Sequence, residues 1–285
     1  KQTQQDYEIR IVTLREIIRQ AKGSPIIQNA TDIRTNIREP WPILNRQEVE
    51  TEQGHIKHIP YQESNQFFDE VILPKYKSAA YDLNSSYIKV VCWRNKTIDF
   101  YNKKIREYLF GSNLPFIIAG DKLITDAPVF EDEKIIIPTN EELLVLKVTI
   151  AEETIGGGEY IKYYKAHVRV TDAAGPFNEY MLRIIHEESI PLYEQVLDLQ
   201  RQVAKSYTPG SYQAKSAWID YYSFIKQWHP VKYSYCISAH KSQGSTYHTA
   251  VINEADIRAN FDVFERNRIL YTACTRPSNN LFILY

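Results

Sequence analysis

The sequence predicts an α/β fold in which a parallel sheet domain is interrupted by a small antiparallel β-barrel. One observation is the apolar run KVVCW at residues 89–93, which is short enough for a buried strand and leads directly into a helical pattern. Another is the change to a period of two between residues 113 and 190, which is typical of antiparallel strands. We therefore predict a discontinuous domain, residues 1–112 and 191–285, and an inserted barrel, residues 113–190.

The composition is that of a soluble globular protein. Of the 285 residues, 44% are hydrophobic and 24% are charged, and no apolar run approaches the roughly 18 residues that span a bilayer. We expect a cytoplasmic protein without a membrane contact. The net charge of −1 excludes a positive field over the whole protein, so a nucleic-acid site would have to be a local groove. The polar start at Lys1 soon gives way to helical periodicity, which suggests a piece of a longer chain.

The cysteines predict neither a disulfide framework nor a metal site. Cys92, Cys236 and Cys274 are widely spaced, lie in apolar segments and form no CxxC pair. We expect them to be reduced thiols in the protein core.

The first part of the chain is predicted to be mainly helical. One helical pattern ends before Gly23, and Ser24 with Pro25 supplies an N-cap and a first-turn proline for a second helix. The stretch EPWPILNRQE, residues 39–48, is predicted to be a loop, and Ser64 is a candidate cap for a third helix. The apolar positions of these three helices are Leu14, Ile17, Ile18 and Ala21, then Ile26, Ile27, Ala30, Ile33 and Ile37, then Phe67, Phe68, Val71 and Ile72.

The middle of the chain predicts a helix, the barrel and two further helices. Helical spacing begins at Asn95, and the glycines of IGGGEY and the stretch AAGPFN fall where hairpin turns are expected. After the barrel, helical patterns surround a break at TPGS, and the chain then enters the strand-like run KYSYCI. The positions that carry these patterns are Ile98, Tyr101, Ile105 and Tyr108, then Leu144, Leu146, Val148 and Ile150 with Tyr164, Ala166, Val168 and Val170, and finally Leu192, Val196, Leu199 and Val203 with Trp218, Tyr222, Ile225 and Trp228.

The polar segment SAHKSQGST, residues 238–246, is the strongest candidate site. It follows KYSYCI, and ligands of parallel α/β sheets bind at the carboxyl ends of strands, where loops expose backbone N–H groups. Its hydroxyl and amide groups suit phosphate oxygens, and Gly244 allows another backbone to approach closely. The alternative is an ordinary solvated loop.

Four stretches resemble a known family. HKSQGST and LYTACTR resemble motifs V and VI of superfamily 1 DNA helicases, particularly the RecD-like and Dda-like branch that moves 5′ to 3′. LREIIRQAKGSPI is similar to motif IV, and VVCWRNKTIDFYNKKIRE to the strand and helix that follow it. The order is that of the family. The resemblance implies a RecA-like (P-loop NTPase-like) second motor domain with an inserted SH3-like barrel.

The resemblance also implies roles for individual residues. Arg19 and Arg276 match arginine fingers that contact the γ-phosphate of ATP, whereas either arginine seen alone would be read as a surface ion pair. Phosphoryl transfer needs preorganised positive charge, which a guanidinium supplies at every relevant pH. The remaining implied residues are Gln20, Gln243, Gly244 and Thr246 on the nucleotide side, and Ser238, His240, Lys241 and Asn95 on the DNA side.

Two parts of a complete helicase are not found in the sequence. No glycine begins a phosphate-binding GxxxxGK[ST] loop, and the only DE pair that resembles a magnesium-binding motif, in FFDEVI at residues 67–72, has the spacing of an amphipathic helix. We expect the N-terminal RecA-like domain of the same protein to hold ATP and Mg²⁺. No metal ligands are predicted in this chain.

The expected function is therefore that of a C-terminal fragment of an ATP-dependent DNA helicase, which translocates 5′ to 3′ on single-stranded DNA and is inactive alone. One alternative is an adaptor module that binds DNA or protein without ATPase activity. Another is a motor subunit of an exonuclease V-type complex, with repair and recombination partners.

Two weaker candidates remain. Tyr160, Tyr163, Tyr164 and Lys162 could bind bases and phosphates or could pack the barrel. The sequence Asp132-Glu133-Lys134 has the form of a nuclease element but is better explained as a charged turn.

Overall fold

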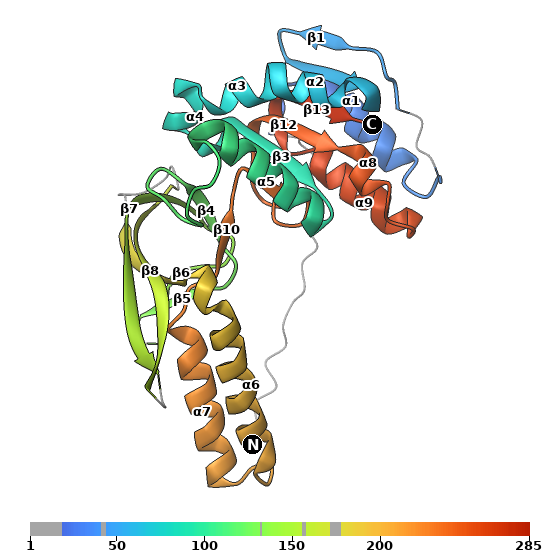
Figure 1. Cartoon of the computed structure of the whole chain (residues 1–285). Coiled ribbons are helices and arrows are strands. Elements are labelled where there is room, and N and C mark those ends of the chain that lie inside the picture. The colour runs from blue at the N-terminus through green and yellow to red at the C-terminus, as the bar shows by residue number, and fades with distance from the viewer. Residues whose placement is uncertain (1–18, 41–43, 132, 156–157, 172–177) are drawn as a thin grey trace, which may run out of the picture.

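The computed structural model describes residues 19–40, 44–131, 133–155, 158–171 and 178–285. It contains a parallel α/β layer, a second, antiparallel sheet beside it, and a pair of long helices that projects away from both (Figure 1). Among the described residues, no helix has the length and apolar character needed to cross a membrane.

The first sheet has six strands within the described part of the chain, in the order β1-β2-β13-β12-β3-β11. All neighbours from β2 to β11 are parallel, and β1 pairs with β2 in an antiparallel hairpin, so the predicted parallel sheet is confirmed. The strands are β1 (Val49–Thr51), β2 (Gly54–Ile59), β3 (Ile88–Cys92), β11 (Cys236–Ser238), β12 (Tyr247–Asn253) and β13 (Pro277–Leu284).

Helices cover both faces of this sheet, which explains why β3 is buried along its whole length. On one face, Ile26, Ile33 and Ile269 pack against Val91 and other strand residues. On the other face, the packing helices include those that contain Phe68, Tyr81 and Ile105. The first face carries α1 (Pro25–Thr35), α8 (Glu254–Ile257) and α9 (Val263–Cys274), and the second carries α2 (Tyr61–Phe67), a π-helical turn (Phe68–Ile72), α3 (Leu73–Tyr76), α4 (Ala79–Leu83) and α5 (Asn95–Phe110).

The second sheet is antiparallel throughout, with the order β10-β4-β7-β8-β9. Its apolar side buries residues such as Leu143, Tyr164 and Leu182. A separate two-stranded ribbon, β5 with β6, completes this part of the described chain, and an SH3-like closure of these strands remains a prediction. The strands are β4 (Lys122–Thr125), β5 (Val129–Glu131), β6 (Lys134–Ile137), β7 (Glu142–Ile155), β8 (Glu159–Val170), β9 (Glu179–Ile185) and β10 (Val231–Tyr233).

The projecting arm consists of α6 (Ile190–Ser206) and α7 (Tyr212–Lys226), which pack against each other. Its base is held by an apolar cluster that joins Ile161 of β8 to Phe224 and Trp228. The sequence assigned these helices to the parallel sheet domain, but the structure attaches them to the second sheet. The chain re-enters the first sheet only at β11.

Buried polar contacts join the two sheets. Arg106 of α5 forms a bidentate ion pair with Asp121, with Nε–Oδ1 and Nη2–Oδ2 distances of 2.8 and 3.0 Å. Lys89 of β3 donates to Glu142 of β7 at 2.7 Å. Lys122 of β4 donates to the carbonyl of Tyr81, and desolvation followed by the nearby Lys89 ammonium lowers the pKa of Lys122 to about 8. These contacts connect the first sheet and its helices to the second sheet.

Several local predictions can be compared with the structure. Ser24 caps α1 by accepting from the N–H of Ile26, as predicted. Ser64 is not a cap: α2 already begins at Tyr61, and the Ser64 hydroxyl donates to the carbonyl of Pro60. FFDEVI is helical, as expected. The first predicted helix (Leu14, Ile17, Ile18), Asp132, the glycines at 156–157 and the turn at 173–177 lie outside the described residues.

Candidate functional site

Residues 239–246 connect the carboxyl end of β11 to the amino end of β12. At the first end, the N–H of Ala239 donates to Cys92 O at 2.9 Å; at the other, the N–H of Tyr247 donates to Arg276 O at 3.1 Å. Between them the backbone forms successive turns, and Gly244 has a φ of +95°, which favours glycine. One short segment therefore has contacts both at the carboxyl ends and at the amino ends of the parallel strands. These two sides of the sheet are called its carboxyl edge and its amino edge below.

Four of the predicted nucleotide-side residues meet at the amino ends of β12 and β13. Arg19 Nε donates to Thr246 Oγ1 at 2.7 Å, and Arg19 Nη1 donates to the carbonyl of Thr275 at 3.1 Å. Gln20 lies beside Arg19 and contacts the same carbonyl, next to Arg276. The structure thus brings together residues that are up to 257 positions apart in sequence.

Gln20 differs from the prediction that it binds nucleotide. Its side chain is buried, and its amide nitrogen donates to the carbonyls of Thr275 and Pro277 at 3.0 and 2.7 Å. These two carbonyls lie on either side of Arg276 in the chain. Gln20 therefore fixes the backbone that carries Arg276, and its own amide N–H groups are already used.

The Arg276 side chain is largely buried in its own segment. Its Nε donates to the carbonyl of Thr272 and its Nη2 to Thr275 Oγ1, both at 2.8 Å. Desolvation, followed by the positive charge of Arg19, lowers the pKa of Arg276. The guanidinium groups of Arg19 and Arg276 lie close together, and none of the contacts given above pairs either of them with a carboxylate. Such a pair of positive charges is suited to an anionic ligand such as a triphosphate.

Gln243 and His240 face a different part of the site. They line a cavity with residues of α9, whose first turn is at the carboxyl edge and whose last turn carries Thr272. Gly244 has open space around the position that a Cβ would occupy, so it makes no close backbone approach here. The other lining residues are Ala239, Glu265, Arg268, Ile269 and Thr272.

The DNA-side residues gather at the carboxyl edge of the sheet. Ser238 ends β11 in register with Cys92 at the end of β3, and Asn95 begins α5 three residues later with an exposed side chain. Ser238 Oγ accepts from the N–H of Lys241 at 3.1 Å, which shapes the first turn of the loop. His240 follows on the same edge. The prediction that these residues contact DNA stays a prediction.

Lys241 has a partner that sequence reasoning missed. Its Nζ lies 2.6 Å from Asp126 Oδ1, and Lys232 Nζ lies 3.2 Å from Asp126 Oδ2. Asp126 directly follows β4, so this ion pair connects the loop 239–246 to the second sheet. After the opposing effect of burial, the hydrogen bond from Lys241 is the main cause that lowers the pKa of Asp126. No sequence signal joins residues 126 and 241, because strand pairing brings them together.

Asp256 is a second residue that the sequence did not reveal. It is buried and accepts from the N–H groups of Trp93 and Arg94 at 2.7 and 2.9 Å, from Arg94 Nε at 2.6 Å and from Thr97. A carboxylate at this position stabilises the start of α5, where orphan N–H groups and the helix dipole are positive. Asp256 therefore sets the position of Asn95.

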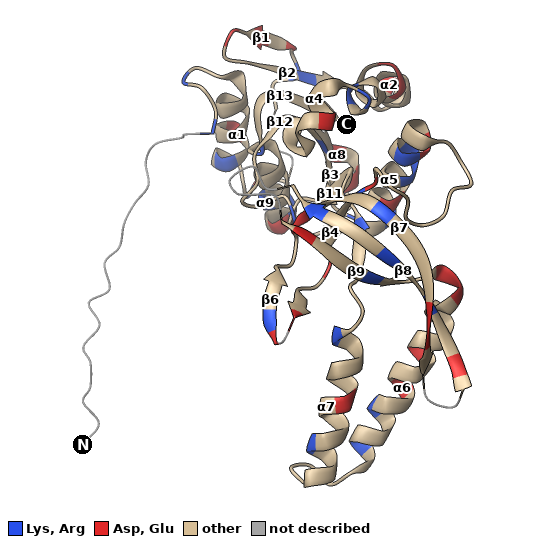
Figure 2. Cartoon of the chain, turned by 90° about the vertical axis from the view of Figure 1, so that its left-hand side faces the viewer, with Lys and Arg blue, Asp and Glu red and all other residues tan. Residues whose placement is uncertain are grey.

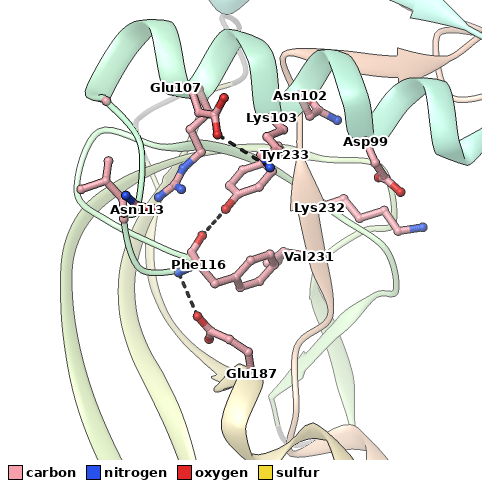
Figure 3. A pocket seen from close by; sticks show the side chains of 13 residues that line it. Asp99, Asn102, Lys103, Glu107, Asn113, Phe116, Glu187, Val231, Lys232 and Tyr233 are labelled. Atoms are coloured by element: carbon pink, nitrogen blue, oxygen red, sulfur yellow. Dashed lines mark hydrogen bonds and ion pairs between the residues drawn. The ribbon is translucent and has the colours of Figure 1, made fainter.

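No metal site is found among the residues that the structure describes, since no three His, Cys, Asp or Glu side chains are grouped to hold an ion. Cys92 and Cys236 have their sulfur atoms 3.6 Å apart and are free, buried thiols, as is Cys274. Of the barrel tyrosines, Tyr164 is buried and donates to Glu187, whose carboxylate also accepts from the N–H of Phe116 in the pocket of Figure 3, whereas Tyr160 is exposed.

The sequence of this chain is similar to those of known helicases. Residues 233–284 match the model of the UvrD-like helicase C-terminal domain. The chain is 24% identical over 209 residues to the ATP-dependent DNA helicase dda of Enterobacteria phage T4, covering 68% of this chain and 46% of that protein. It is 21% identical over 244 residues to the uncharacterized protein R530 of Acanthamoeba polyphaga mimivirus, covering 72% of this chain and 49% of that protein. The chain spans about half the length of these curated relatives.

Solved structures of Pif1 helicases are also similar. The Pif1 helicase from Candida albicans is 12% identical, with a TM-score of 0.41, and the match covers 94% of this chain and 55% of that one. The Bacteroides Pif1 helicase in complex with ADP-AlF3 and ssDNA is 13% identical, with a TM-score of 0.40 and coverage of 95% and 51%.

The parallel sheet and the matched C-terminal segment define a helicase-related α/β domain. More particularly, the chain is similar to a Dda helicase over 209 residues, and its residues 233–284 match the C-terminal domain of UvrD-like helicases.

Proposed function

We propose that this chain is the C-terminal motor half of a DNA helicase that hydrolyses ATP and moves 5′ to 3′ on single-stranded DNA. In this proposal its parallel sheet is the second RecA-like domain, and its antiparallel sheet belongs to an inserted SH3-like barrel. The observation that carries the proposal is the meeting of Arg19, Thr246 and Arg276 at one edge of the parallel sheet.

The nucleotide side of the proposal rests on these two arginines. ATP with Mg²⁺ would be held by an N-terminal RecA-like domain that supplies the phosphate-binding loop, and this domain would close over it. Arg19 and Arg276 would then stabilise the negative charge on the transferring phosphoryl group, since their side chains are already held close together. Gln20 would keep Arg276 in place rather than contact ATP.

The DNA side rests on the opposite edge of the same sheet. Ser238, His240 and Asn95 would contact the backbone of single-stranded DNA there, together with Lys241. Strand register places the two ends of the loop 239–246 near Cys92 and Ile88, about 13 Å apart along β3. Closure of the two domains around ATP would therefore change the DNA contacts at the carboxyl edge through the loop 239–246, as expected of a hinge with two states.

The central experiment is Arg276→Ala in the full-length protein. We expect DNA-stimulated ATP hydrolysis to fall about a thousandfold, because one finger arginine is worth at least that much, while the affinity for single-stranded DNA changes less than twofold. Arg34→Ala, which removes an exposed arginine from the last turn of α1, is the matched control and should leave both values unchanged. Normal turnover in Arg276→Ala would refute the finger assignment.

The motor and the adaptor module differ in whether the full-length protein contains an N-terminal domain that binds ATP. An adaptor module would bind DNA with no ATPase activity in any length of the protein, whereas a motor requires a GxxxxGK[ST] loop in the N-terminal half. Measuring ATP hydrolysis by the full-length protein, with and without single-stranded DNA, separates these two proposals. We also propose a cytoplasmic location and a role in DNA repair or recombination.

A further inference from the structure

The far end of the helical arm is positively charged. We define the arm tip as residues 199–219, which contain the last two turns of α6, the connecting loop and the first half of α7. The tip carries Arg201, Lys205 and Lys215 and contains neither aspartate nor glutamate. The carboxylates of the arm lie nearer its base, at Glu194, Asp198 and Asp220, and Figure 2 shows this separation along the two helices.

The arm tip also exposes large apolar and aromatic side chains. Tyr212 has 82% of its side chain exposed, although it stands at the first position of a helix that packs on α6. Trp218 stacks on Tyr222, with ring centroids 5.8 Å apart and an interplanar angle of 27°. A cavity between the helices is lined by Lys205, Tyr207, Pro209, Lys215, Trp218 and Ile219. The other exposed apolar residues are Leu199, Val203, Tyr207 and Ile219.

Intramolecular packing does not account for these side chains. Lys205 and Lys215 are exposed, and in the described part of the chain neither forms an ion pair. Arg201 is different, because its Nη1 lies 3.5 Å from Asp198 Oδ1 and its Nη2 donates to the hydroxyl of Tyr221 at 2.9 Å. Exposed apolar patches on a soluble protein mark interaction sites, and a cationic rim restricts the partner to one of negative charge.

We propose that the arm tip is a second binding site for single-stranded DNA, separate from the carboxyl edge of the parallel sheet. The nature of the partner rests on the proposed function. Lysines contact backbone phosphates while exposed aromatic rings stack on unpaired bases, and this combination is the usual basis of sequence-independent single-strand binding. An acidic protein surface would satisfy the lysines, but single-stranded DNA supplies both a phosphate for each lysine and a base for each exposed ring in every nucleotide.

The length of the arm separates the tip from the carboxyl edge of the parallel sheet, so the tip would hold the DNA strand at a second point. Seventeen residues of α6 extend about 25 Å, so the tip lies well away from the sheet that carries β8 and β9. A strand bound at both places would be held at two points of one rigid half of the motor. The tip would then keep the strand close when the loop 239–246 releases it.

The test is DNA binding by the 285-residue chain, with a fluorescent oligothymidylate as the probe and anisotropy measured from 50 to 300 mM NaCl. Lys205→Ala with Lys215→Ala should make the slope of log K against log salt about 1.4 less steep, since each phosphate contact contributes about 0.7 on single strands. This difference in slope corresponds to a roughly 25-fold weaker affinity of the double variant at 0.1 M salt. Tyr212→Ala should weaken binding about fivefold or more through lost stacking, with little change in slope.

The matched control is Lys134→Ala with Lys165→Ala, which removes two exposed lysines from β6 and β8. An equal loss in this control, or unchanged affinity and slope in the tip variant, would overturn the proposal; unchanged binding would instead favour a protein partner. Because the altered residues are exposed, all variants should unfold at the same temperature as the wild type. A separate His240→Ala variant tests the proposed function: if only the tip variant loses binding, the tip site stands and the DNA role of the loop fails.

Discussion

Gln20 acts on the arginine site from the protein interior. Its buried amide donates to the carbonyls on both sides of Arg276 and so holds the backbone of that segment. The resemblance to the helicase motifs grouped Gln20 with the nucleotide ligands. Its burial assigns it to positioning instead, since a side chain whose donors are already used cannot also bind phosphate.

This difference can be measured with a double-mutant cycle in the full-length protein. Gln20→Ala should lower kcat for ATP hydrolysis roughly 10- to 100-fold by misplacing Arg276, while KM for ATP stays within twofold. Because Gln20 acts through Arg276, the double variant Gln20→Ala with Arg276→Ala should be no slower than Arg276→Ala alone. A raised KM with normal kcat would restore Gln20 as a nucleotide ligand.

At the scale of elements, the buried pair between Arg106 and Asp121 joins α5 to the start of β4. Asp121 is fully buried and also accepts from Tyr235 Oη at 3.0 Å and from the N–H of Ile118 at 2.9 Å. Such a pair adds little to stability compared with an apolar replacement, but removal of one partner leaves a charge buried without compensation.

We expect Arg106→Met to destabilise the chain by about 3 to 5 kcal/mol, because the Asp121 carboxylate loses its only cation among these contacts. Adding Asp121→Asn should recover part of that loss, since the buried charge is then removed. The free energy of unfolding from urea titrations of the 285-residue chain measures both effects. Arg106→Met stability equal to that of the wild type would mean that the pair is solvated and does not tie the elements together.

Elements with a strong local signal could be predicted from the sequence. The run KVVCW gave β3 to within one residue, and Ser24-Pro25 gave the start of α1. The run KYSYCI was predicted as one strand, yet β10 belongs to the antiparallel sheet and β11 to the parallel one. The change occurs at Ser234 and Tyr235, where Ser234 N–H donates to Lys122 O and Tyr235 O accepts from the N–H of Val90. Local periodicity carries no information about which sheet a strand joins.

The arm shows the same limit for helices. Its helical spacing was evident, but an amphipathic helix does not specify which of two cores it covers. Leu192, Tyr193 and Val196 pack toward Ile161 and Trp228, so the arm belongs with the second sheet. The motifs led to Arg19, Thr246 and Arg276, which the structure brings together, while their role at a nucleotide stays a prediction. Asp126, Asp256 and the positioning role of Gln20 depend on contacts between distant segments, which no single stretch encodes.

At the scale of the whole molecule, the two sheets are coupled at the loop 239–246 itself. Asp126, directly after β4, pairs with Lys241 of the loop and also with Lys232, so one carboxylate offsets part of the positive charge of two lysines beside the proposed DNA edge. The chain has a net charge of −1, and local charges of this kind therefore decide where a polyanion can approach. In the proposed function, a DNA phosphate at Lys241 would have to compete with Asp126.

Removing this competition should strengthen DNA binding. Asp126→Asn keeps the shape of the side chain and frees both lysines, so we expect a severalfold higher affinity for oligothymidylate at 50 mM NaCl and a steeper salt dependence by about 0.7 for each added phosphate contact. The gain should disappear above 300 mM NaCl, where the lysines are screened. Glu131→Gln, which removes a carboxylate from the exposed end of β5, is the matched control and should have no effect. If Asp126→Asn binds no better than the wild type at low salt, Lys241 does not face the DNA, and the coupling between the sheets through this ion pair is structural only.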